Sequence, residues 1–407
     1  MKRKLYTQIL TEWRSNLWLV IELTVVSLVI WTIIFLLFVE TKGLRMPRGF
    51  DPDNVYVTTP FGVSKESPRY IPSDDNGYYR DLADIVNRLK RDPTVESVAV
   101  ASSFPYYLDY YGTSATPADF SDTIFYSANL RMCTPEYIDV FRIKSLAGTP
   151  SARLKEMLGR DEILISDNMP YQEKGRKPAD LKGKRVFIDN DSSKTYRIAD
   201  VIENIRRSDY EEVRDGTILR LMPADHLWGT VVIRVRPGHE TRFEESFREN
   251  VAMRSQRNVY LTDLRPLSQV RETAQRDVAT SINTKLTIML FMLATIFLGL
   301  LGSFWFRMQQ RVGEIAIRKV CGATRRQIFT RVISEGMILL LAATIVAAAC
   351  VWPFHSDICE YLDESWTPIL VCEIVAAAII AVGIVISLWW PARRAMRIDP
   401  AEAIKAE

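Results

Sequence analysis

Four long apolar segments limit what this 407-residue chain can fold into. An α-helix rises 1.5 Å per residue, so roughly 20 consecutive apolar residues cross a hydrocarbon core about 30 Å thick. The segments occupy residues 17–39, 286–306, 332–352 and 368–390. The second has no charged residue, and each of the others has a single glutamate. The sequence therefore predicts a membrane protein with four transmembrane α-helices.

The first apolar segment is predicted to stay in the protein as an anchor. No small-residue cleavage site follows it, and it is longer than the apolar core of a signal peptide. Before it, Leu5, Ile9 and Trp13 lie four residues apart among basic side chains. This spacing predicts a short helix in the cytoplasmic interface of the membrane, and an irregular basic tail is the alternative.

The distribution of Lys and Arg predicts the orientation of the spans, because short basic flanks stay in the cytoplasm. Basic residues cluster before the first span, between the second and third spans, and after the fourth. The loop between the third and fourth spans instead has four acidic residues and no Lys or Arg. Both termini are therefore predicted to be cytoplasmic, and the long region between the first two spans is predicted to be extracytoplasmic.

These features predict a layout with one large external region and several short parts. In residue numbers, the parts are a cytoplasmic interfacial helix (1–16), the first transmembrane helix (17–39), the external domain with its stalk (40–281), the second transmembrane helix (282–306), a cytoplasmic coupling helix and turn (307–331), the third transmembrane helix (332–352), a short external loop (353–367), the fourth transmembrane helix (368–390) and a cytoplasmic tail (391–407). No strong turn signal interrupts the chain between about 267 and 307. An external helix is therefore expected to continue unbroken into the second span.

The external region shows the same order of elements twice. The first set is a strand at 55–59, an amphipathic helix at 78–91 and a strand at 95–102. The second set is a strand at 229–236, a helix at 240–255 and a strand at 258–264. Two such halves predict a split βαβ module.

A second external module is predicted between the two halves. It begins with a helix that Thr134 is expected to cap. Strand patterns follow at 162–165, 185–188 and 196–202, separated by polar turns. The large external domain is therefore predicted to be α+β, with a mixed α/β module inserted into the split βαβ module.

Composition and motifs argue against several functions. The formal net charge of +3 is too close to neutral to favour a nucleic-acid partner. Five widely spaced cysteines and three histidines without ligand spacing argue against a structural zinc site or a disulfide framework. The exterior has no GxSxG or HExxH motif, which argues against a membrane-anchored enzyme. Cys133 is expected to be buried, and His226 and His239 are expected to lie on the surface.

The acidic and small residues of the spans are predicted to be structural. Glu22, Glu335 and Glu373 lie near the start of their spans, where a carboxylate costs less than at the bilayer midplane. They are therefore assigned to helix contacts rather than to an ion pathway. Gly299, Gly302 and the alanines of the third and fourth spans are expected to allow close helix packing.

The cytoplasmic loop is predicted to be a helix, a tight turn and a second helix. Its apolar residues fall on one helical face: Val312, Ile315, Ala316, Val320 and Ala323. Gly322 lies where helices often end in the left-handed region, and Thr324 can cap the next helix. An amphipathic segment that only rests on the lipid surface is the alternative.

The loop and the start of the third span contain, in order, Arg311, Glu314, Ile315, Ile317, Arg318, Lys319, Gly322, Ala323 and Glu335. This pattern resembles the signature of FtsX-like permeases of the ABC transporter class. The C-terminal segment PARRAMRIDPAEAI, at 391–404, is similar to the closing motif of the same family, which gives an expected FtsX-like permease domain at 282–404. Upstream, TVESVAVAS, YSANLRMCTPEYIDVFRIKSLAGTP, EILIS and YRIADVIEN resemble the MacB-like periplasmic core domain, with its porter-like module and insert.

The resemblance implies a permease subunit with no catalytic, cofactor or metal site of its own. The chain has no GxxxxGK[ST] motif to hold nucleotide phosphates, so ATP and magnesium are expected on a separate cytoplasmic ABC ATPase dimer. The residues expected to couple to that ATPase are Arg311, Glu314, Ile315, Arg318, Lys319, Gly322 and Ala323. Those expected to serve helix packing or structure are Glu335, Pro391, Arg393, Arg394 and Pro400. The other implied partners are membrane lipid and a second copy or a paralogous four-span permease, in the inner membrane.

Two functions fit this resemblance. The first is mechanotransmission, in which ATP hydrolysis drives work outside the cytoplasm, such as export of a peptide, drug or lipid-linked substrate with a periplasmic adaptor or an outer-membrane tunnel. The second is a transmembrane signalling subunit that activates an envelope hydrolase or a sensor partner and transports nothing. The sequence alone leaves both open.

Overall fold

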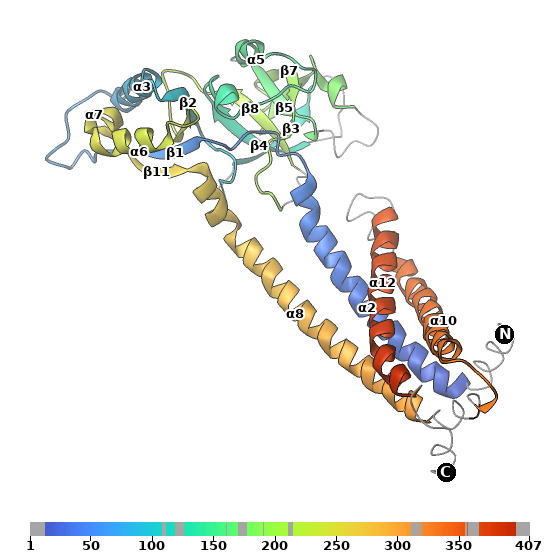
Figure 1. The fold of residues 1–407 in the computed structure, drawn as a ribbon. Coiled ribbons are helices and arrows are strands. Elements are labelled where there is room, and N and C mark those ends of the chain that lie inside the picture. Colours follow the sequence, from blue (N-terminus) through green and yellow to red (C-terminus); the bar gives the residue numbers. More distant parts are fainter. Residues whose placement is uncertain are drawn as a thin grey trace. The chain divides into compact units, whose positions relative to one another are not determined.

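The computed structural model describes residues 13–107, 111–118, 126–159, 161–169, 177–189, 191–210, 215–310, 317, 320–354, 356 and 366–395. The chain divides into two compact units (Figure 1). The α+β unit is Lys42–Ala279, and the membrane unit combines Met1–Thr41 with Thr280–Glu407. Residues 1–12 of the predicted interfacial helix lie outside the described residues, and Trp13 begins helix α2.

One of the two modules of the α+β unit is built on antiparallel strands in the order β10-β11-β1-β9-β2. Its elements are β1 (Val55–Gly62), α3 (Gly77–Lys90), β2 (Val95–Ala101), β9 (Thr230–Val235), α6 (Glu240–Glu249), α7 (Val251–Arg254), β10 (Ser255–Gln256) and β11 (Val259–Pro266). The units β1-α3-β2 and β9-α6-α7-β11 interleave, because β9 lies between β1 and β2, and β1 lies between β11 and β9. This order confirms the predicted split βαβ arrangement.

Side-chain alternation explains why this sheet is buried on both faces. Apolar residues at every second position of a strand point to the same face. On one face, the helices pack on the sheet through a core that includes Leu82, Ile85, Val231, Ile233 and Phe243. On the other face, Val55, Val57 and Val232 pack with Tyr137 and Phe141, which follow β4 in the chain.

The inserted module consists of six strands that close on themselves. They are β3 (Tyr111–Pro117), β4 (Tyr126–Cys133), β5 (Glu162–Ser166), β6 (Arg185–Ile188), β7 (Thr195–Ile202) and β8 (Gly216–Leu221). Pairing runs β4-β3-β6-β7-β5-β8, and a parallel pairing of β8 with β4 completes the ring. The helical elements of the module are short: α4 (Tyr137–Val140), α5 (Ser151–Met157) and η3 (Pro178–Leu181). The insert is therefore mainly a β-barrel, to which short helices are added.

One detail of the insert differs from the sequence prediction. Thr134 does not cap α4, which begins at Tyr137 after Glu136. Instead, the Thr134 hydroxyl accepts a hydrogen bond from the backbone N–H of Val100 (3.2 Å), and the N–H of Thr134 donates to the carbonyl of Val100 (2.9 Å). Thr134 thus continues the antiparallel pairing of β4 with β2, and this pairing joins the insert to the sheet.

A buried arginine holds the sheet and the insert together. Arg234 on β9 is only 1% exposed. Its Nε donates to the Val140 carbonyl (2.6 Å), its Nη1 to the Asp53 carbonyl (2.8 Å) and its Nη2 to the Asp51 carbonyl (2.7 Å). The Asp51 carboxylate lies 3.4 Å from Nη1 and supplies the opposite charge. Arg234 therefore satisfies carbonyls of two segments far from it in sequence.

The membrane unit has four helices long and apolar enough to cross a membrane, which confirms the predicted number of spans for the described residues. They are α2 (Trp13–Lys42), α8 (Leu267–Gln310), α10 (Arg325–Val351) and α12 (Thr367–Ala395), with a 3-10 turn η4 (Trp352–Phe354) after α10. Helix α8 is one continuous element of 44 residues. The core of the unit joins α2, α10 and α12 through Leu23, Ile30, Leu340, Ala343, Ala376 and Ile380.

The polar and small residues of the spans have different surroundings. The Ser303 hydroxyl on α8 donates to the Glu22 carboxylate on α2 (3.0 and 3.1 Å), a helix contact of the kind expected. Glu373 Oε1 is buried and has no recorded hydrogen-bond partner. A Cβ at Gly299 or Gly302 would meet no atom within 4 Å, so their role in close helix packing stays a prediction. Within the described part of the chain these glycines therefore face no neighbouring helix.

Replacement of Arg234 is expected to loosen the α+β unit. Arg234→Met would leave three main-chain carbonyls and Asp51 without their buried partner, which costs about 3 kcal/mol or more. The unfolding midpoint of the full chain in detergent, followed by near-ultraviolet circular dichroism, should fall by roughly 6 °C or more. Arg236→Met, at an exposed position two residues later, is the matched control and should change the midpoint little. Equal midpoints for the two variants would contradict this role of Arg234.

Candidate functional site

The two segments that lead from the α+β unit toward the spans are bound to the same loop. One is residues 43–48, which follow α2 and begin with the 3-10 turn η1 (Gly43–Arg45). The other is the start of α8, residues 267–271, which contains Arg271. The loop is residues 204–210, between β7 and β8. All three segments belong to the α+β unit.

Asp209 is the central group of this contact. Its Oδ1 accepts hydrogen bonds from Arg48 Nε (3.1 Å) and from the Tyr106 hydroxyl (3.1 Å). Its Oδ2 accepts a hydrogen bond from Arg271 Nε (2.6 Å). The carboxylate side chain is 4% exposed, whereas Arg48 and Arg271 are 38% and 39% exposed. One buried carboxylate thus joins both segments.

Arg206 reinforces the same contact through the backbone. Its Nη1 donates to the carbonyls of Gly43 (2.5 Å) and Met46 (3.3 Å), and its Nη2 donates to the carbonyl of Asp209 (3.1 Å). Gly43 fits here because it has no side chain: a Cβ would lie 2.6 Å from the carbonyl oxygen of Tyr210. We call Arg48, Tyr106, Arg206, Asp209 and Arg271 the Asp209 joint.

The charges and hydrogen bonds of the Asp209 joint keep Asp209 ionised and Tyr106 neutral over a wide pH range. Burial acts to raise the pKa of Asp209, but the positive charges of Arg271 and Arg48 and the hydrogen bonds from Arg271 and Tyr106 outweigh it and lower this pKa. Burial, together with the charge of Asp209, raises the pKa of Tyr106 to about 12. Tyr106 therefore stays a neutral donor, and Asp209 stays a charged acceptor. The polar groups are already matched, so the joint is suited to holding segments together rather than to catalysis.

The structure describes only part of the predicted coupling loop. Arg311, Glu314, Ile315, Arg318 and Lys319 lie outside the described residues. Gly322 has a φ of +89°, which confirms the predicted left-handed turn, and Ala323 follows it.

The turn leads into α10 as predicted. Thr324 caps α10: its hydroxyl accepts a hydrogen bond from the N–H of Gln327 (3.3 Å), and Gln327 Oε1 accepts one from the N–H of Thr324 (3.0 Å). The turn and the start of the second helix are thus fixed by local hydrogen bonds.

The remaining predicted structural residues lie on the last two helices or beyond them. Glu335 lies in the first half of α10. Helix α12 continues to Ala395 and includes Pro391, Arg393 and Arg394 in its last turns, five residues past the predicted end of the span. Pro400 lies outside the described residues.

Sequence reasoning missed the Asp209 joint. The hydrogen bond between Arg48 and Asp209 joins residues that are 161 positions apart along the chain, so no local spacing indicates the contact. The only signal is the run Arg206, Arg207 and Asp209 in a short loop between strands, which also fits a solvated turn.

Comparison with known proteins gives one family match. Residues 286–400 match the model described as FtsX-like permease C-terminal. No curated protein sequence matches the chain.

Several solved structures are similar to part of the chain, and two of them are a region of MacB and a domain of YknZ. The periplasmic region of MacB from Actinobacillus actinomycetemcomitans is 13% identical, with a TM-score of 0.34, and the match covers 57% of this chain and 98% of that one. The extracellular domain of the noncanonic ABC-type transporter YknZ from Gram-positive bacteria is 12% identical, with a TM-score of 0.31, and the match covers 51% of this chain and 100% of that one. The family assignment rests on the match over residues 286–400 rather than on these likenesses. The chain therefore carries an FtsX-like permease C-terminal domain, and the predicted resemblance to FtsX-like permeases is confirmed over that part.

Proposed function

We propose that this chain is the permease subunit of an ABC transporter that couples ATP hydrolysis by a separate cytoplasmic ATPase to conformational work outside the cytoplasm. The observation that carries the proposal is the FtsX-like match over residues 286–400, which includes the coupling loop and the second, third and fourth spans. The four apolar helices and the large α+β unit fit this role. Both termini and the loop at 307–331 are assigned to the cytoplasm from the distribution of Lys and Arg, and the membrane is assigned as the inner membrane.

The form of coupling that we propose is mechanical. An aqueous path for a substrate needs polar side chains along several spans. Here Glu22 is hydrogen-bonded to Ser303, and the core that joins α2, α10 and α12 is mainly apolar. Helix α8 belongs to both units as one unbroken element, and the Asp209 joint binds the start of α8 to the segment that follows α2. A displacement of the spans would therefore act on the α+β unit through two segments at once.

The proposed ATPase contact is the coupling loop. Gly322 and the Thr324 capping box fix the direction in which the chain turns before α10. The segment before this turn carries Arg311, Glu314, Ile315, Arg318 and Lys319, the residues proposed to contact the ATPase dimer. ATP and magnesium would be bound by that partner.

A second four-span subunit is proposed to complete the membrane part. Gly299 and Gly302 on α8 lie one turn apart and meet no atom of the described chain within 4 Å. Small residues at such positions allow helices of two subunits to approach closely in lipid. The partner subunit would be a second copy of this chain or a paralogous permease.

Loss of charge in the coupling loop should release the ATPase. The double variant Glu314→Ala and Lys319→Ala is expected to reduce co-purification of the ATPase at least tenfold and to leave membrane insertion unchanged. The matched control is Lys65→Ala with Glu66→Ala, which removes the same two charges from an exposed loop of the α+β unit. Equal recovery of ATPase with both double variants would show that the docking residues are assigned wrongly.

Loss of the Asp209 carboxylate should uncouple the α+β unit from the spans without releasing the ATPase. Asp209→Asn cannot pair with the charges of Arg48 and Arg271, so residues 43–48 and 267–271 should exchange amide hydrogens several-fold faster in the assembled complex. ATP-dependent changes in exchange within the α+β unit should shrink, while ATPase co-purification stays unchanged. Asp225→Asn, at an exposed position without a recorded ion pair, is the control.

Acid should reproduce the Asp209→Asn effect in the unsubstituted protein. Because the pKa of Asp209 is lower in the folded chain, its stabilising contribution is complete above the ordinary pKa of an aspartate and is lost as the pH falls through the lowered value. Protection of residues 43–48 should therefore persist at the ordinary pKa of an aspartate and fall only as the pH drops below it. If Asp209→Asn and the unsubstituted protein showed the same amide protection of residues 43–48 at every pH, the mechanical role of the joint would be overturned.

A further inference from the structure

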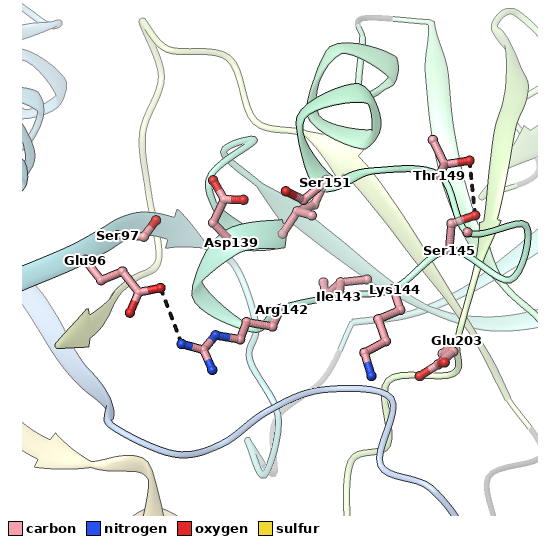
Figure 2. Close-up of a pocket in the computed structure, with 12 residues that line it drawn as sticks. Glu96, Ser97, Asp139, Arg142, Ile143, Lys144, Ser145, Thr149, Ser151 and Glu203 are labelled. Atoms are coloured by element: carbon pink, nitrogen blue, oxygen red, sulfur yellow. Dashed lines mark hydrogen bonds and ion pairs between the residues drawn. The ribbon is translucent and has the colours of Figure 1, made fainter. Parts of the chain in front are cut away.

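A polar cavity of about 660 Å³ lies in the α+β unit, away from the Asp209 joint. Its wall comes from β2, from α4 and the chain after it, and from Glu203 at the end of β7 (Figure 2). This volume falls within the roughly 300–1,000 Å³ of typical small-molecule sites, which are frequent where two modules meet. Here one side of the cavity belongs to the split βαβ module and the other to the barrel insert.

Much of the charge around the cavity is already paired. Arg142 Nη1 lies 2.9 Å from the Asp51 carboxylate, and its Nη2 lies 3.5 Å from Glu96. Asp139 is paired with Lys155 at 2.5 Å. These pairs fix the rim on the side of β2 and α4.

The opposite wall is held by a buried aspartate. Asp200 is 1% exposed and accepts hydrogen bonds from the hydroxyls of Ser145 (3.0 Å) and Thr149 (2.6 Å) and from Lys182 Nζ (2.7 Å). Because Asp200 is anchored in β7, these bonds keep residues 145–149 in place. The cavity is thus formed before any ligand arrives.

Lys144 and Glu203 are two opposite charges of the wall, and neither forms an ion pair within the described residues. Their main chains are hydrogen-bonded, because the N–H of Glu203 donates to the carbonyl of Lys144 (2.9 Å). Figure 2 shows both side chains at the same end of the cavity, while Ser97, Asp139 and Ser151 lie away from that end. The cavity therefore offers an adjacent ammonium and carboxylate at one end and hydroxyl groups elsewhere.

This arrangement selects one ligand chemistry over others. A simple anion would meet the carboxylates of Glu96, Asp139 and Glu203, and a simple cation would meet Arg142 and Lys144. The part of the chain that the structure describes contains no cluster of metal-ligating side chains. Among the described residues that line the cavity there is no aromatic ring, so a sugar would lack a stacking surface there.

We propose that this cavity binds a small molecule with an α-amino-acid group. The ligand carboxylate pairs with Lys144 and the ligand ammonium pairs with Glu203, since both charges of an α-amino acid lie on neighbouring atoms. The side chain of the ligand then extends into the rest of the cavity, whose lining includes hydroxyl groups. The inference does not depend on the proposed coupling to an ATPase.

The test is titration of the full chain in nanodiscs with L-serine, L-asparagine and L-glutamine, followed by isothermal calorimetry. At least one of them should bind with a Kd below about 1 mM, corresponding to about 4 kcal/mol. Its N-acetyl amide derivative, which lacks both charges, should bind at least tenfold more weakly. Lys144→Gln and Glu203→Gln should each weaken binding of the free amino acid at least tenfold.

Matched variants separate this site from a general effect of charge. Lys65→Gln and Glu66→Gln, in an exposed loop outside the cavity, should leave the affinity unchanged. Unfolding midpoints of Lys144→Gln and Glu203→Gln should match the unsubstituted chain, because neither side chain has a recorded ion pair. Absence of binding for all three amino acids, or equal binding of the free and blocked forms, would overturn the proposal.

Discussion

Buried guanidinium groups that bind main-chain carbonyls hold the α+β unit together. Arg234 binds the carbonyls of Val140, Asp51 and Asp53, and Arg206 binds those of Gly43, Met46 and Asp209. Arg131, 2% exposed, donates to the Ile205 carbonyl and the Tyr137 hydroxyl. A guanidinium has five fixed donors and remains charged at any relevant pH, so it can satisfy several carbonyls that would otherwise be buried without partners. Each arginine thereby fixes loop segments that lack the regular main-chain hydrogen bonds of a helix or a sheet.

Sequence periodicity predicted the elements whose contacts are local or regular. The helix α3 and the strands β1, β2, β9 and β11 lie close to their predicted ranges, because each has an apolar face with a period that matches its structure. The spans and the Gly322-Thr324 turn were predicted for the same reason: length, left-handed backbone and capping are local properties.

The rest of the unit depends on contacts that no local pattern encodes. Strands β3 and β4 contain Ser, Thr, Gly, Ala and Asn instead of a run of β-branched residues, and they become strands because they complete a closed barrel. Parallel pairing of β8 with β4 joins segments almost ninety residues apart in the chain. The Asp209 joint and the Lys144-Glu203 pair likewise depend on chain topology, since each brings together residues from different loops.

The two kinds of buried charge contact differ in how readily they could be rearranged. Arg234 is almost fully buried, so breaking its bonds would strand a charge and several carbonyls in the core. In the two ion pairs of the Asp209 joint, the carboxylate is buried, whereas Arg48 and Arg271 each keep more than a third of their side chain in solvent. Water can replace a lost partner for a half-exposed arginine, and such ion pairs contribute modest free energy. Arg234 therefore suits a permanent tie between the two modules, whereas the ion pairs of Arg48 and Arg271 with Asp209 suit a contact that can be rearranged at a lower cost in free energy.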